Sequence, residues 1–139
     1  ERPASDRYER ETQAHAMNNL TGVHLGRGDV KSAILWCERS LMLKERLGLD
    51  ARTNYVNLLF FWLEQKTAYG HDRARHYLRQ LLFLEGGQDH LEATLATKSY
   101  ESPVQAFRAA GLDKEFPEIK LPPKPRQRTL ALKERRQGA

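Results

Sequence analysis

Residues 14–46 carry two helical patterns separated by a glycine turn, and this pairing constrains the fold more than any other feature of the sequence. Met17 and Leu20 lie on the apolar face of a first helix, and Gly-Asp at 28–29 forms the turn. A second apolar ladder follows, made of Ala33, Leu35, Trp36, Cys37, Ser40 and Leu41. Apolar residues three and four positions apart share one face of a helix. The segment therefore predicts two antiparallel helices that pack through these faces.

Helix start and stop signals extend this reading along the chain. Asp29 is placed to cap the second helix, because its carboxylate can accept from the exposed amides of the first turn. Gly-His-Asp at 70–72 reads as a second turn, and Ser102 before Pro103 is a strong start signal. The predicted helices cover residues 7–25, 30–47, 51–68, 73–85, 89–99 and 102–111.

A small residue recurs at the place where paired helices would cross. Ala74 lies 41 residues after Ala33, and Ala106 lies 32 residues after Ala74. An alanine is suited to such a crossing because it occupies little room. The pattern resembles the tetratricopeptide (TPR) repeat. The 41-residue spacing exceeds the usual repeat length of about 34 residues and is similar to the long repeats of kinesin light chains. The chain departs from the family pattern at Thr21, His24, Cys37 and Trp62.

The resemblance implies an all-α fold of antiparallel helical hairpins, stacked over residues 1–119 as a short TPR-like solenoid. An extended basic tail would follow over residues 120–139. An unrelated antiparallel helical bundle uses the same periodicities and remains the alternative. TPR proteins are almost always scaffolds that bind another protein and are rarely enzymes. The resemblance therefore implies a non-catalytic adaptor without a cofactor.

The resemblance also implies where such a partner would bind. In a TPR the first helix of each pair lines a concave groove, which places five residues in it: His15, Asn18, Leu59, Leu63 and Lys66. Residues 55–63 are apolar nearly all round, and helices of this kind are buried on every side. Either a partner segment lies over this helix, or the chain's own residues 87–119 do.

The positive charge is concentrated at the C-terminal end. Residues 120–139 have a net charge of +6, and the rest of the chain has a net charge of −1. The basic residues of this tail are Lys120, Lys124, Arg126, Arg128, Lys133, Arg135 and Arg136. Arginine suits phosphate, so the tail is interpreted as an RNA-binding or membrane-surface arm, with a solubilising terminus as the alternative. Without aromatic residues after Phe116, contact with RNA would be limited to the backbone.

The remaining signals argue against catalysis. The five histidines show neither the spacing of a zinc protease nor the companions of a metal site, and the lone Cys37 forms no internal disulfide. The longest apolar run, 58–63, has six residues, whereas a membrane span needs about 20. A single thiol favours a reducing, intracellular compartment, either the cytoplasm or an organelle such as the mitochondrial matrix. The absence of an initiator Met agrees with a processed or partial chain. A structural subunit of a large assembly, such as an organellar ribonucleoprotein, is the alternative function.

Overall fold

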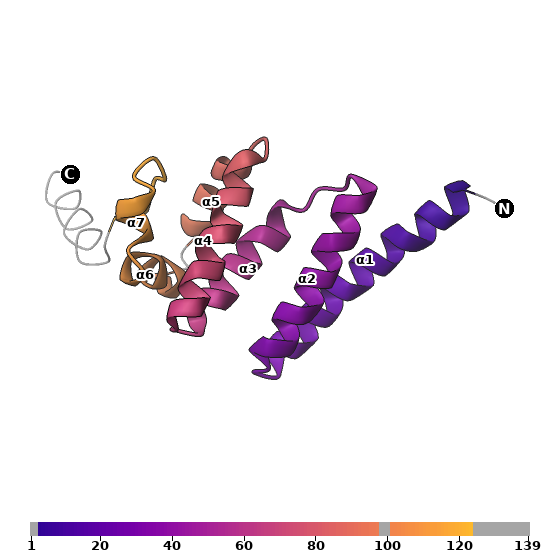
Figure 1. The fold of residues 1–139 in the computed structure, drawn as a ribbon, viewed down its shortest axis with the longest axis horizontal. Helices are drawn as coiled ribbons and strands as arrows, with labels where there is room; N and C mark the ends of the chain where they lie inside the picture. The colour runs from indigo at the N-terminus through magenta and orange to yellow at the C-terminus, as the bar shows by residue number, and fades with distance from the viewer. Residues whose placement is uncertain (1–2, 98–100, 124–139) are drawn as a thin grey trace, which may run out of the picture.

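The computed structural model describes residues 3–97 and 101–123, and every regular element within them is an α-helix (Figure 1). The helices are α1 (Pro3–Gly26), α2 (Val30–Leu47), α3 (Arg52–Glu64), α4 (Ala68–Phe83), α5 (Gly87–Leu95), α6 (Glu101–Ala109) and α7 (Leu112–Glu115). α1 pairs with α2, and α3 pairs with α4. The pairs follow one another along the long axis of the molecule. The prediction of an all-α fold of antiparallel helix pairs is confirmed for these residues.

The turn between α1 and α2 has the predicted chemistry. Gly28 has a φ of 76°, in the left-handed region that glycine adopts without steric cost. Asp29 caps α2, where its Oδ1 accepts from the amide of Ser32 at 3.1 Å. Farther along the pair, the Ser40 hydroxyl donates to the carbonyl oxygen of Ala14 at 2.9 Å. This bond spans the helix interface, because the small side chains there let the two backbones approach closely.

The predicted turn at 70–72 is wrong. The chain turns earlier, at Lys66, whose φ is 53°, and Thr67 then caps α4 by accepting from the amide of Gly70 at 2.9 Å. Gly70 lies inside the first turn of α4. A Cβ there would lie 2.6 Å from the carbonyl oxygen of Trp62, so this glycine allows close packing of α4 on α3. Gly70 is thus required by the packing of the two helices and not by a turn.

The core is centred on α3, which packs against α2, α4, α5 and α6. Its composition explains this position, since eight of its 13 residues are buried. The core continues through Leu78 and Leu81 of α4, Leu91 of α5 and Phe107 of α6, each of which is fully buried. Helices α5 and α6 begin and end within a few residues of the predicted ranges. The short α7 was not predicted.

Residues 116–123 have no helical structure and contact α5 and α6. Ile119 is buried in the core, and the backbone amide of Lys120 donates to Glu92 of α5 at 2.7 Å. Arg108 of α6 donates to the carbonyl oxygen of Pro122 at 2.7 Å. The first residues of the predicted tail are therefore held against the helical body.

Candidate functional site

The leucines predicted to line a groove are part of the core. Leu59 is 0% exposed and Leu63 is 2% exposed, on the helix that α2, α4, α5 and α6 all contact. Because α5 and α6 are among the helices that pack on α3, residues 87–119 cover part of this helix, as the second sequence interpretation expects. His15 and Lys66 are exposed and Asn18 is half-buried. The structure does not bring the five residues together on one surface.

Of the predicted tail residues, the structure describes Lys120 alone. Its side chain is exposed, while its backbone amide binds Glu92. The other six lie outside the described residues: Lys124, Arg126, Arg128, Lys133, Arg135 and Arg136. A polyanion site in this tail stays a prediction.

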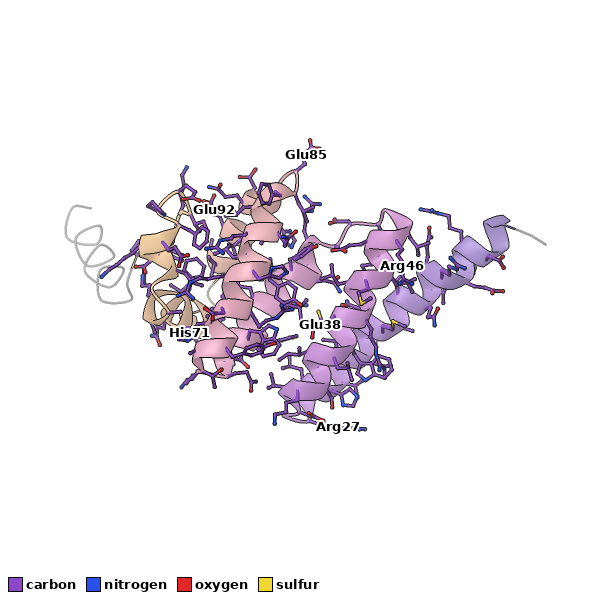
Figure 2. The ribbon with its side chains drawn as sticks, viewed as in Figure 1. Arg27, Glu38, Arg46, His71, Glu85 and Glu92 are labelled. Carbon is purple, nitrogen blue, oxygen red and sulfur yellow. The ribbon has the colours of Figure 1, made fainter. Side chains whose placement is uncertain are left out.

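An open groove lies between α2 and α4, on a different surface from the predicted one. It consists of two adjoining cavities of about 990 and 380 Å³ that share Glu45, Tyr55 and Gln80. We call it the α2–α4 groove. Its lining is Glu38, Leu41, Met42, Glu45, Gly48, Leu49, Asp50, Ala51, Arg52, Tyr55, His76, Tyr77, Gln80, Leu84, Glu85 and Gly86. Figure 2 shows Glu38 between α2 and α4, and Glu85 at the far end of α4.

Two buried tyrosines form the floor of the α2–α4 groove and bind glutamates of α2. The Tyr77 hydroxyl donates to Glu38 Oε2 at 2.6 Å, and the Tyr55 hydroxyl donates to Glu45 Oε1. The guanidinium of Arg73 stacks over the ring of Tyr77, donates to its hydroxyl at 2.8 Å and lies 3.5 Å from Glu38. These side-chain contacts fix the positions of the Glu38 and Glu45 carboxylates.

Burial first, and then the hydrogen bond to a glutamate, raises the pKa of Tyr55 and of Tyr77. In the unfolded chain both hydroxyls titrate near the ordinary value of about 10. Above that pH the unfolded chain loses two protons that the folded chain keeps. The unfolding free energy therefore falls by about 1.4 kcal/mol per pH unit for each tyrosine, until the folded-state pKa is reached.

We expect the double variant Tyr55→Phe/Tyr77→Phe to show a shallower decline of unfolding free energy as the pH rises above about 10. Urea unfolding followed by circular dichroism at a series of pH values measures this slope. The matched control is Tyr8→Phe/Tyr69→Phe, because both rings are largely exposed. Equal slopes in the two double variants would show that the floor tyrosines titrate as exposed ones do.

The rim of the groove combines negative charge with exposed apolar surface. Glu38, Met42 and Glu45 stand at i, i+4 and i+7 of α2 and so form one stripe. The Met42 side chain is 56% exposed, and Leu84 across the groove is 36% exposed. Because apolar and charged side chains alternate along this stripe, it can bind a ligand through both hydrophobic and ionic contacts.

A metal site and a thiol nucleophile each have requirements that the described residues do not meet. Within residues 3–97 and 101–123, no group of three or more His, Cys, Asp or Glu side chains could hold a metal ion. Cys37 is fully buried, and burial raises the pKa of its thiol to about 12, so it is not a nucleophile at neutral pH. None of the described helices is both long and apolar enough to cross a bilayer.

The sequence interpretation missed the α2–α4 groove, although part of its signal is visible. The stripe of Glu38, Met42 and Glu45 can be found from helical spacing alone. Comparison with protein-family models, with curated proteins and with solved structures gives no match. The geometry of the groove is therefore the evidence from which its function is inferred.

Proposed function

We propose that the chain is a non-catalytic adaptor that holds a segment of a partner protein in the α2–α4 groove. The observation that carries this proposal is the groove itself, which is open between the two helix pairs and has exposed apolar side chains on both walls. Each of its two cavities, of about 990 and 380 Å³, lies in the range of protein sites that bury a ligand, about 300–1,000 Å³. Because Met42 is flexible and polarisable, it can adapt to the side chains of a partner.

The proposal includes a TPR-like relation between the two pairs. Its support is the equivalent position of Ala33 in α2 and Ala74 in α4, both fully buried where each helix packs on the first helix of its pair. Residues 48–51 connect α2 to α3 and line part of the groove between α2 and α4, the second helix of each pair. In this arrangement the partner lies between the second helices of successive pairs. We place this function inside the cell, in keeping with a single, buried thiol.

A double substitution on the rim tests the proposal. Met42→Gln/Leu84→Gln is expected to weaken capture of native partners by about tenfold or more, because a buried apolar side chain contributes about 1.5–3 kcal/mol. Capture from a lysate by the purified, tagged chain, quantified over a range of bait concentrations, measures this change. Partners must also remain bound after nuclease treatment.

The matched control is Leu20→Gln/Val23→Gln on α1, because these side chains are 37% and 47% exposed and lie outside the groove. Control and wild type should capture the same proteins. Equal losses in both double variants, or no loss in the rim variant, would refute groove binding.

The charge of residues 120–139 supports a second candidate, a structural subunit of a ribonucleoprotein. Here the tail neutralises RNA phosphates, and the affinity falls steeply with salt. Glutamine at the six basic positions of 124–139 would abolish RNA binding in a filter-binding assay, whereas the rim variant would bind RNA normally. Affinity that is independent of salt or of the tail charges would contradict this candidate.

A further inference from the structure

We infer that the segment held in the α2–α4 groove is basic, rich in lysine and arginine around at least one apolar anchor. The inference rests on the proposed function and specifies the chemical class of its partner. It derives from the charge of the lining, from the way that two of its carboxylates are held, and from the place of Met42 between them.

The lining of the groove is strongly acidic, with four carboxylates and one guanidinium. The carboxylates belong to Glu38, Glu45, Asp50 and Glu85. The guanidinium of Arg52 is already engaged with Asp50, to which it donates at 3.0 and 2.8 Å. Arg52 also attracts Glu85, but one guanidinium cannot balance these carboxylates, so the lining keeps a net negative charge. A basic segment would be attracted to this surface and an acidic one repelled.

The carboxylates on α2 are held in place by groups that leave their charge intact. Tyr55 donates a neutral hydroxyl to Glu45; a tyrosine with the ordinary pKa of about 10 already keeps its proton at neutral pH, and burial raises the pKa further. Tyr77 does the same for Glu38, whose charge Arg73 partly offsets at 3.5 Å. A side chain fixed before binding loses less conformational entropy on binding. Glu45 is therefore the acceptor best prepared for a lysine or arginine of the partner.

The apolar requirement follows from Met42, which stands one helical turn from both Glu38 and Glu45. A partner side chain that covers Met42 would bring its neighbours, one turn away on either side, close to the two glutamates. An apolar residue flanked at helical spacing by lysine or arginine meets all three groups at once. A purely polar basic segment would leave the methionine uncovered.

The probe for this inference is a labelled helical peptide of about 14 residues, composed of lysine, arginine and leucine, roughly four turns long. A second peptide carries glutamate at every basic position. The chain contains two methionines, Met42 in the groove and Met17 on α1, so methyl-labelled methionine gives one signal at the site and one internal reference. We expect the basic peptide to shift the Met42 signal and to leave the Met17 signal in place.

The charge dependence is tested with two double variants of equal net charge. Glu45→Gln/Glu85→Gln is expected to lower the affinity for the basic peptide by about tenfold, measured by fluorescence anisotropy at constant salt. Glu9→Gln/Glu64→Gln removes the same charge from exposed positions outside the groove and should change the affinity by less than about twofold. Equal losses would reveal general charge attraction and overturn the inference.

Three further outcomes would also overturn it. A Met42 shift with the acidic peptide would mean that the groove binds a partner of the other charge, and the proposed function would stand. If glutamine at the six basic positions of 124–139 raised peptide affinity by about tenfold or more, the occupant would be the chain's own tail. If neither peptide shifts the Met42 signal, the capture experiment with the rim variant separates two cases. If the rim substitutions weaken capture, only the inference of a basic partner is refuted. If they leave capture unchanged, the proposed function is refuted as well.

Discussion

Leu59→Ala is expected to lower the unfolding free energy by about 2–5 kcal/mol, the usual cost of truncating a buried leucine. Leu59 is 0% exposed and lies on α3, the helix that four other helices cover. The cavity left behind could close only by moving helices that pack on α3. A loss of this size is a large share of the roughly 5–15 kcal/mol that stabilises a domain. Urea unfolding followed by circular dichroism measures it.

Leu35→Ala on α2 is the matched control, because the same side chain is 46% exposed there. We expect its unfolding free energy to stay within about 0.5–1 kcal/mol of the wild type. Were Leu59→Ala as mild as this control, α3 would be open to solvent, and the groove predicted around Leu59 and Leu63 would be reinstated. The experiment thus separates the two interpretations that the sequence left open.

The first helix pair is the part of the fold that the sequence predicts best. Its signals are local: Gly28 needs a positive φ, Asp29 caps the next helix, and Ala33 begins a series of apolar residues at helical spacing. Each depends on residues within a few positions along the chain. The structure confirms the turn and the cap where they were expected.

The second helix pair shows where local signals fail. Glycine is a common turn residue, so the local pattern predicts a turn at Gly70, whereas in the structure Thr67 caps α4 ahead of it. The distinction depends on the distance from Gly70 to Trp62, which exists only after α3 and α4 have packed. The burial of Leu59 likewise depends on the helices that pack on α3, some of which come later in the chain, and no periodicity within α3 indicates which helix covers which side.

The α2–α4 groove was predictable only in part for the same reason. The stripe of Glu38, Met42 and Glu45 is a property of one helix and can be found in the sequence. Tyr55 and Tyr77 come from two other helices, and neither shows from its neighbours that it reaches a glutamate of α2. The site arises from the separation of the two helix pairs, which is a tertiary property.

Gly87→Ala is expected to destabilise the protein by about 3 kcal/mol, at the upper end of the cost of forcing extra atoms into a packed site. A Cβ on Gly87 would overlap the carbonyl oxygen of Leu81 and lie 2.9 Å from its carbonyl carbon. Neither atom is the flexible end of a side chain, so the turn between α4 and α5 must open to accept the methyl group. Thermal and urea unfolding measure the loss.

The control is Gly22→Ala, the same substitution in α1, where a Cβ would meet nothing within 4 Å. It should raise the unfolding free energy by about 0.5–1 kcal/mol, because alanine favours the helix. Opposite signs for one chemical change would show that backbone contact, and not helix propensity, determines the effect at Gly87. Since Gly86 and Leu84 in the same turn line the α2–α4 groove, Gly87→Ala should also weaken partner capture. A Gly87→Ala protein as stable as the wild type would mean that α5 does not approach Leu81 this closely.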